Sequence, residues 1–456
     1  MQHPFPCGFA FGAATSAYQI EGAASDDGRG PSIWDTLVRQ RPALARAHPP
    51  AVACDHYHRY RDDVALAKAL GLQAYRFSIA WPRVLPTGRV ALNRRGLDFY
   101  RRLVGSLLEA GIEPVPTLFH WDLPQPLQDE GGFMRRGIAD DFARYVDVVM
   151  QALGGHVKRW ITLNEPWEFA FLGHGLGWHA PGHKRPWNFL KLMHHQLLAH
   201  AMAVEVIRSR QPDAQVGITV SQTPIHPSRP GPADQAAADF GNDFFNRVTL
   251  DPLLRGQYPE RLWRRFAGLR PRVEAGDLAR IATPLDFIGV NNYQRERVRS
   301  APWIPLLRAW LRPDPAIGPE GRTAMGWEIY PEGLHEVLTT LRTEYGNPPV
   351  IVTENGAAFD DEPAQGAVHD PRRIDYLRRY LAQVARALAE GCDVRGYFVW
   401  SLLDNFEWQE GFSKRFGLIH VDYATQARTV KDSGWWYRDF IAQTVGRLTA
   451  TAAASP

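Results

Sequence analysis

The stretch ITLNEPWEFA, residues 161–170, leads from a buried strand to a carboxylate. Its β-branched and apolar residues end at Leu163 and give way to Asn164, Glu165 and Pro166. Proline lacks the backbone N–H that a sheet ladder needs, and it pushes the preceding residue away from helix. We therefore expect the strand to stop here, with Glu165 at its tip.

The stretch VIVTENGAAF, residues 350–359, repeats this arrangement. Val350–Thr353 is typical of a buried strand, and Glu354 stands at its end. Asn355-Gly356, which follows, is a turn signal. The sequence thus places two glutamates at the ends of two buried strands.

Eight short apolar runs occur along the chain, and helical patterns separate most of them. They are Phe9–Ile20, Ala74–Trp81, Glu113–Trp121, Trp160–Leu163, Val216–Val220, Phe287–Tyr293, Val350–Thr353 and Gly396–Leu403. Apolar strands that alternate with amphipathic helices predict a parallel sheet covered by helices on its outer face. Eight such units predict a single α/β domain, a (β/α)8 TIM barrel with long βα loops. The alternative is an open doubly wound sheet, but the phosphate-binding glycine loop usual after its first strand is not found here.

The barrel is expected to take up residues 1–456, with the small, polar tail from about 450 frayed. Two helices show the expected pattern most clearly. In the first, Asn93 is placed to cap the helix and Gly111 to end it. Its apolar face is Leu97, Tyr100, Leu103, Val104, Leu107 and Leu108. In the second, the apolar face is Phe142, Tyr145, Val146 and Val149.

Composition restricts the classes of function. The chain has 456 residues, 45% hydrophobic and 22% charged, which fits a soluble globular protein. The net charge of +3 and the scattered basic residues argue against nucleic-acid binding, and no apolar run is long enough to span a membrane. Three cysteines without CxxC spacing and an N-terminus without a signal-peptide pattern favour the cytoplasm. The histidines of 193–200 lack zinc-site spacing, so we expect no metal.

Polar and aromatic residues gather where the predicted strands end. In a barrel of this kind these ends form the mouth of the active site. They carry Gln19, Arg76, Trp81, His120, Trp121, Asp122, the two glutamates and the segments GVNNY and VWSLLDNFEW. Two carboxylates at one rim suggest glycoside hydrolysis, in which one protonates the leaving oxygen and the other attacks the sugar or activates water. A strand-end glutamate is often only a helix cap or half of an ion pair, but two of them, each beside an asparagine, weaken that alternative.

The chain resembles glycoside hydrolase family 1, the β-glucosidase family, nearly from end to end. The motifs that carry the resemblance are FAFGAATSAYQIEGA, FHWDLP, TLNEP, IVTENG and WSLLDNFEWQEGFSKRFGL. The resemblance implies a (β/α)8 barrel and a retaining β-glycosidase, first of all a β-glucosidase, that needs no cofactor. Its substrates would be small β-glycosides or short β-linked oligosaccharides, as in cellulose degradation.

The resemblance also implies a role for each site residue. Glu165 would be the general acid/base and Glu354 the nucleophile. The remaining positions are Gln19, His120, Asn164 and Glu407 for the sugar hydroxyls, Trp400 and Trp408 as walls of the same subsite, Arg76 and Tyr293 beside the nucleophile, and Trp167 and Trp327 as walls of the leaving-group site. Where the family usually has Asn-Tyr-Tyr, this chain has Asn291-Asn292-Tyr293, and we expect Tyr293 to keep its hydrogen bond to Glu354.

A retaining mechanism predicts that the two carboxyl groups lie about 5–5.5 Å apart. Two anions that close disfavour joint ionisation, so one pKa rises. Because Arg76 and Tyr293 are expected to stabilise the charge of Glu354, we expect Glu165 to be the protonated partner.

Two alternatives stay open. A 6-phospho-β-glycosidase typically has a serine, with a lysine and a tyrosine nearby, where this chain has Glu407 and Trp408, and a carboxylate there would repel a phosphate. A non-catalytic carbohydrate-binding protein on the same fold should have lost one of the two glutamates. The segment 294–326, the least regular of the chain, is expected to be a long active-site loop.

Overall fold

Eight parallel strands form the centre of the molecule. The computed structural model describes residues 5–46 and 48–453, and in it the strands close into a barrel in the order β1-β11-β10-β7-β5-β4-β3-β2. Their bounds are β1 (Ala10–Ala14), β2 (Ala74–Ser78), β3 (Glu113–Phe119), β4 (Arg159–Asn164), β5 (Gln215–Ser221), β7 (Phe287–Asn291), β10 (Val350–Asn355) and β11 (Val394–Trp400). The ring closes because β1 pairs in parallel with both β11 and β2. The predicted (β/α)8 barrel is confirmed.

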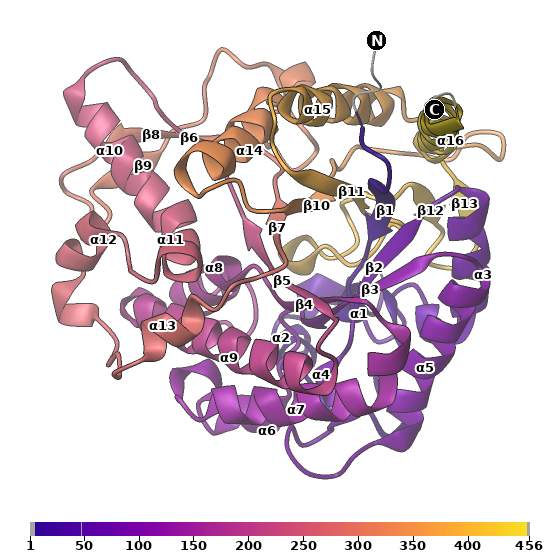
Figure 1. The fold of residues 1–456 in the computed structure, drawn as a ribbon, viewed down its shortest axis with the longest axis horizontal. Coiled ribbons are helices and arrows are strands. Elements are labelled where there is room, and N and C mark those ends of the chain that lie inside the picture. Colours follow the sequence, from indigo (N-terminus) through magenta and orange to yellow (C-terminus); the bar gives the residue numbers. More distant parts are fainter. Residues whose placement is uncertain (1–4, 47, 454–456) are drawn as a thin grey trace.

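Long helices surround the barrel (Figure 1). They are α3 (His56–Ala69), α5 (Arg94–Glu109), α7 (Ile138–Leu153), α9 (Phe189–Arg210), α14 (Glu332–Glu344), α15 (Pro371–Ala389) and α16 (Asp432–Ala453). Shorter helices lie in the connections: α1 (Ala17–Ile20), α2 (Ile33–Gln40), α4 (Trp81–Val84), α6 (Gln125–Asp129), α8 (Pro166–Glu168), α10 (Pro232–Asn242), α11 (Val248–Arg255), α12 (Glu260–Arg265) and α13 (Asp277–Ile281).

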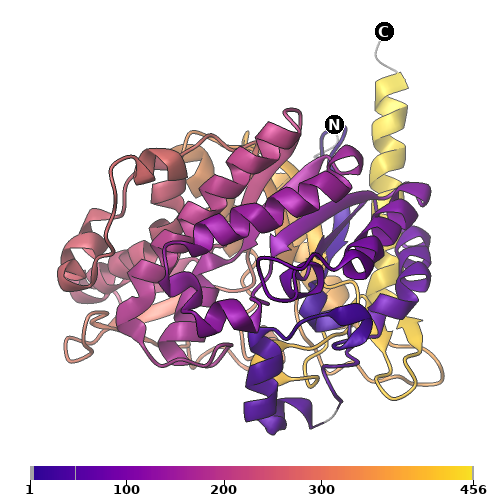
Figure 2. The ribbon, with the colours of Figure 1, turned by 90° about the horizontal axis from the view of Figure 1, so that it is seen from below.

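The long connections after the strands gather at one end of the barrel. In Figure 2 the indigo and yellow loops lie on the side away from the end of α16. Of the tail expected to be frayed, residues 454–456 lie outside the described part of the chain, and α16 itself continues to Ala453. None of the described helices is both long and apolar enough to cross a membrane.

Several apolar runs of the sequence extend beyond the ends of the strands they contain. The run Phe9–Ile20 holds β1 and then the helical turn α1, so Gln19 lies on a helix and not at a strand end. Trp81 likewise begins α4, where Pro82 suits the first helical turn, and its ring stacks on Tyr145 at a centroid distance of 4.9 Å. The reason is shared: residues beyond the strand ends are still buried, under the long loops, so apolarity does not mark where pairing stops.

The predicted helix patterns hold with two corrections. All four apolar residues named on α7 are buried, and Gly111 follows α5 with a left-handed φ of 76°. Asn93, however, does not cap α5; its side-chain amide donates to the Arg83 carbonyl at 2.9 Å. Leu108 is 45% exposed, because it lies at the edge of the apolar face.

The segment 294–326 is more regular than its composition predicted. It contains β8 (Glu296–Ser300) and β9 (Ala309–Leu311), which with β6 (Ile225–Pro227) make a three-stranded sheet outside the barrel. On β8, Val298 is buried while its neighbours are partly or fully exposed, an alternation typical of a one-sided strand. This alternation covers only a few residues, and the proline, arginine and tryptophan residues around it made the segment look irregular in the sequence.

A buried ion network fixes the loops that follow β10 and β11. The ammonium of Lys431, between β13 (Arg428–Val430) and α16, donates to Asp361 and Asp404, at 2.7 Å each. Asp404 also accepts from Arg415 at 2.8 Å. The remaining strand of this region, β12 (Ile419–Val421), pairs with β13. The side chains of Lys431, Asp361 and Asp404 are all buried.

Replacing Lys431 with methionine is therefore expected to destabilise the protein by about 3–5 kcal/mol, because two buried carboxylates each lose one of their cations. Urea denaturation at neutral pH measures this free energy of unfolding. The matched control is Lys191→Met on the exposed face of α9, expected within about 0.5 kcal/mol of the parent. A loss below about 1 kcal/mol for Lys431→Met would show that the network is not structural.

Candidate active site

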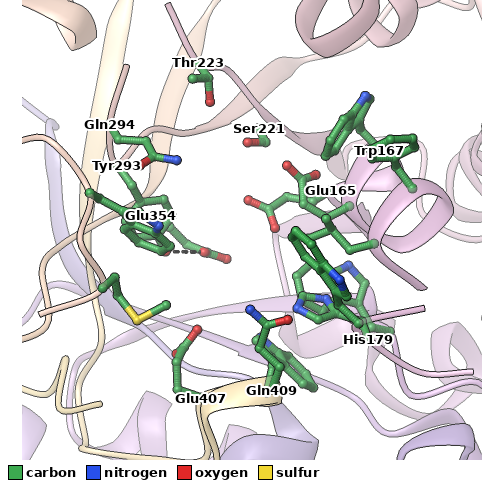
Figure 3. A pocket seen from close by; sticks show the side chains of 18 of the residues that line it. Glu165, Trp167, His179, Ser221, Thr223, Tyr293, Gln294, Glu354, Glu407 and Gln409 are labelled. Carbon is green, nitrogen blue, oxygen red and sulfur yellow. Dashed lines mark hydrogen bonds between the residues drawn. The ribbon is translucent and has the colours of Figure 1, made fainter. Parts of the chain in front are cut away.

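A cavity of about 410 Å³ opens where the barrel strands end. Nine of the predicted site residues line it: His120, Glu165, Trp167, Tyr293, Trp327, Glu354, Trp400, Glu407 and Trp408. Figure 3 shows Glu165 and Glu354 facing each other across its middle. Asn164 and Gln19 are buried beside the cavity and bond to the residues or loops that form its wall.

The backbone presents Glu165 to the cavity through a tight turn. β4 ends at Asn164, and Pro166 starts the short helix α8. Between them Glu165 adopts φ 45° and ψ 70°, a left-handed conformation that is uncommon for a residue with a side chain. Its N–H still donates to the Thr219 carbonyl of β5 at 2.9 Å. The neighbouring strand therefore holds the strained residue in place.

Glu165 is surrounded by neutral donors and by other carboxyl groups. Asn291 donates to its Oε1 at 2.8 Å and Asn164 to its Oε2 at 3.3 Å. Burial raises the pKa of Glu165 well above that of an ordinary glutamate, and the charges of Glu168 and Glu354 raise it further. The Asn291 hydrogen bond and the charge of Arg76 oppose this rise without cancelling it. The neutral acid is thus favoured at Glu165.

Glu354 has the opposite surroundings. The guanidinium of Arg76 donates to its Oε1, and the Tyr293 hydroxyl donates to its Oε2 at 2.6 Å, the hydrogen bond drawn in Figure 3. Both donors stabilise a carboxylate. The contacts expected from the sequence for Arg76 and Tyr293 are confirmed.

The departure from the family pattern at Asn292 leaves this arrangement intact. The Asn292 side chain donates to the Gln222 carbonyl at 2.8 Å, and its backbone N–H donates to the Glu354 carbonyl at 3.1 Å. Asn355 in turn donates to the Asn292 carbonyl at 2.7 Å. Asn292 therefore supports the backbone on both sides of Tyr293 and Glu354.

His120 offers a free donor to the cavity. The Asn164 amide donates to His120 Nε2 at 3.2 Å, which places the ring proton on Nδ1. That Nδ1 is buried and has no hydrogen-bond partner among the described residues. Burial and the charge of Arg76 hold the pKa of His120 well below its usual value, so the ring is neutral. It can donate to an uncharged ligand.

The segment that follows β11, which includes Glu407 and Trp408, forms another wall of the cavity. Gln19 accepts from Ser16 at 2.6 Å and donates to Asn405 at 3.0 Å and to the Phe406 carbonyl at 2.7 Å. It thereby fixes the backbone just before Glu407. The Oε2 of Glu407 is buried and has no partner in the described structure. Burial, with the charges of Glu354 and Glu410, raises the pKa of Glu407 to about 8.

Sequence analysis missed several residues of the cavity wall. Trp167 and Trp327 line the cavity as predicted, but so do Glu168, Ser221, Thr223, Glu296 and Gln409. Ser221 ends β5, the one barrel strand whose end was not searched for site residues. Glu168 lies three residues after Glu165, a spacing that places two side chains on the same side of a helical turn.

The histidines of 193–200 bond to neighbouring protein groups. His194 contacts Asp277 at 3.0 Å, His195 the Phe133 carbonyl at 2.8 Å and His200 the Thr162 hydroxyl at 2.7 Å. Over residues 5–46 and 48–453 no group of three His, Cys, Asp or Glu side chains could hold a metal ion.

The sequence model of glycosyl hydrolase family 1 matches residues 1–445. The chain belongs to this family. Beta-glucosidase A of Acetivibrio thermocellus is 45% identical over 441 residues, which cover 96% of this chain and 98% of that protein. A 1,4-beta-D-glucan glucohydrolase of Thermotoga neapolitana is 45% identical over 439 residues, with 96% and 98% covered.

A solved structure of a family 1 member agrees with the fold. Beta-glucosidase from Thermotoga maritima in complex with deoxynojirimycin has a TM-score of 0.93 and 44% sequence identity to this chain. The match covers 96% of this chain and 99% of the other. This family 1 chain is accordingly a glycoside hydrolase, as its motifs predicted.

The charge of Glu354 is expected to raise the pKa of Glu165 in this family 1 enzyme. Replacing Glu354 with glutamine removes a neighbouring carboxylate, so ionisation of Glu165 becomes easier and its pKa should fall. Titration of ¹³C-labelled glutamate side chains by NMR, assigned with Glu165→Gln, measures this. Glu205→Gln, on the surface of α9, is the control. An unchanged or higher pKa for Glu165 would contradict the proposed coupling.

Proposed function

We propose that this protein is a retaining β-glucosidase that releases terminal β-D-glucosyl residues through a covalent intermediate. One observation carries the proposal: two carboxyl groups share a cavity but have opposite surroundings. Arg76 and Tyr293 donate hydrogen bonds to Glu354, whereas burial and neighbouring carboxyl groups raise the pKa of Glu165. A glycosidase that retains configuration needs this division between nucleophile and acid.

In the first step the Glu354 carboxylate attacks the anomeric carbon of the sugar. As the glycosidic bond breaks, Glu165 gives its proton to the leaving oxygen. The sugar is then bound to Glu354 as an ester, and the leaving group departs as an alcohol. General acid assistance of this kind typically contributes about 10²–10⁴-fold to the rate.

In the second step Glu165 changes from a general acid to a general base. The ester has no negative charge, so one cause of the raised pKa of Glu165 disappears. The Glu165 carboxylate left by the first step can now take a proton from water, which attacks the anomeric carbon. The bond to Glu354 breaks, and both glutamates return to their starting states.

The sugar would lie between Glu354 and the wall formed by Glu407 and Trp408. His120 offers a donor to a hydroxyl through Nδ1, and Glu407 offers an oxygen that has no partner among residues 5–46 and 48–453. Trp400 would lie against the sugar ring. Gln19 and Asn164 stay in the proposal as ligands of the hydroxyls, supported here by their places beside Glu407 and Glu165.

The charge of the cavity favours an unphosphorylated substrate. Six of the residues that line it are glutamates, and no lining residue within the described chain is lysine or arginine. A phosphate would meet repulsion without a cation to bind it. The binding-only alternative is weak for another reason, because both glutamates are present and both face the cavity.

The same proposal includes short β-linked oligosaccharides as natural substrates, a place in cellulose degradation, and location in the cytoplasm. Cys7, Cys54 and Cys392 are all free, which suits a reducing compartment.

The expected activity is efficient hydrolysis of an aryl β-D-glucoside and at least about 100-fold lower kcat/KM for its 6-phosphorylated form, since about 2.7 kcal/mol of charge repulsion gives that ratio. Glu354→Gly should lower kcat by more than about 10⁴-fold, because the step has no other nucleophile. Circular dichroism and thermal unfolding confirm that the variant folds. Preference for the phosphorylated substrate, or retained activity in Glu354→Gly, would overturn the proposal.

A further inference from the structure

The cavity holds a carboxyl group that the two-step reaction does not use. Glu168, at the end of α8, lines the cavity together with Glu165. Its Oε2 is buried and has no hydrogen-bond partner in the described part of the protein. A buried polar atom without a partner is costly, so its presence in the wall of a ligand cavity points to a partner supplied by the ligand.

Glu407 has the same combination of properties. It too lines the cavity with a buried Oε2 that has no partner in the part of the chain that the structure describes. Burial raises the pKa of Glu168 to about 8, as it does for Glu407, while a hydrogen bond with the Ser221 side chain and one with the backbone oppose the rise at Glu168. Glu407 is the group proposed to bind hydroxyls of the sugar. Glu168 therefore has the properties of a second hydroxyl-binding site.

The two groups serve different ends of the cavity. In Figure 3, Glu407 and Gln409 lie on one side of the catalytic pair, and Ser221 and Thr223 lie on the opposite side. Glu168 interacts with Ser221, which places it on that opposite side. When the sugar occupies the Glu407 side, the leaving group must extend past Glu165 toward Glu168, Ser221 and Thr223.

We propose that Glu168 is a specificity-determining residue that binds a hydroxyl of the leaving group, so that the enzyme favours a sugar as leaving group over one without hydroxyls. This inference rests on the proposed β-glucosidase activity. It adds which class of β-glucoside the enzyme accepts best.

The chemistry of the wall fits a hydroxyl better than an ion or an apolar group. At neutral pH a carboxyl group with a pKa of about 8 is mostly protonated, so it can both donate and accept a hydrogen bond. A sugar hydroxyl can do the same, and Ser221 and Thr223 add two more hydroxyl groups to this wall. A leaving group without hydroxyls would leave the Oε2 of Glu168 unpaired, and sites built for a hydroxyl discriminate strongly on that basis.

The test compares two substrates with alcohol leaving groups, cellobiose and hexyl β-D-glucoside. Both need a proton from Glu165, but only cellobiose has hydroxyls on the leaving group. A p-nitrophenyl glucoside, whose leaving group needs little acid assistance, reports separately on the nucleophile and on folding. The variants are Glu168→Val, which removes the hydrogen-bonding group, and Glu168→Gln, which keeps an acceptor and a donor at the same place.

For Glu168→Val we expect kcat/KM for cellobiose to fall about 10–100-fold. The value for hexyl β-D-glucoside should stay within about 3-fold of the parent or rise, since valine suits an alkyl chain. Glu168→Gln should keep cellobiose hydrolysis within about 5-fold of the parent. The ratio of the two substrates is the decisive quantity, because effects on folding or on the sugar side cancel in it.

Three results would overturn the inference. Equal losses on cellobiose and hexyl β-D-glucoside would show that Glu168 acts through the proton of Glu165 and not on the leaving group. An unchanged substrate ratio in Glu168→Val would show that it does neither. If Glu168→Val fails to fold, Ser221→Ala must lower the cellobiose preference in its place, and no change there counts against the inference. Failure of the proposed function is a different pattern, in which the parent protein hydrolyses none of the three glucosides.

Discussion

The buried guanidinium of Arg76 is the interaction on which the site depends. Its side chain has no exposure to solvent, and it donates to Glu354, to Asn164 at 2.7 Å and to Thr117 at 3.1 Å. These partners come from β10, β4 and β3, while Arg76 itself belongs to β2. A buried cation is tolerated only when several acceptors surround it, and only a closed barrel brings these four strands to one point. Barrel closure and the contact between Arg76 and the proposed nucleophile are therefore one requirement.

The division of labour between the glutamates follows from how this one charge is shared. Arg76 touches Glu354 directly but reaches Glu165 only through Asn164, whose amide separates them. It lowers the pKa of Glu165 less than burial and the neighbouring carboxyl groups raise it. The same residue type thus serves as anion in one place and acid in the other, because environment and not identity sets the proton affinity.

Most of the fold could be predicted because strand ends leave local signals. Pro166 after Glu165 and Asn355-Gly356 after Glu354 mark both proposed catalytic positions within a few residues of sequence. Gln19 was misplaced because apolarity continues past β1 under a loop. Glu168 was not predicted, although it belongs to the stretch 161–170. The residues next to it in the sequence do not indicate whether a glutamate on a helical turn faces water or a cavity. That difference is decided by α8 packing against the end of β5, contacts that lie more than fifty residues away along the chain.

The acidic cavity lowers the stability of the folded protein, and interactions elsewhere in the molecule must offset this loss. Glu168 and Glu407 have pKa values of about 8 in the folded protein, against about 4.3 for an unfolded glutamate. A folded-state pKa above the unfolded one means that the folded protein binds more protons between these values, so stability falls as pH rises from about 4.3 toward 8. The neutral carboxyl groups that suit sugar hydroxyls are hence the groups that weaken the fold at neutral and alkaline pH. A cation in the cavity wall would remove this penalty, but it would also turn the carboxyl groups into ion pairs and withdraw them from a neutral ligand. The lining residues that the structure describes include no lysine or arginine. Such a lining suits a substrate that is uncharged and carries hydroxyls on both sides of Glu165.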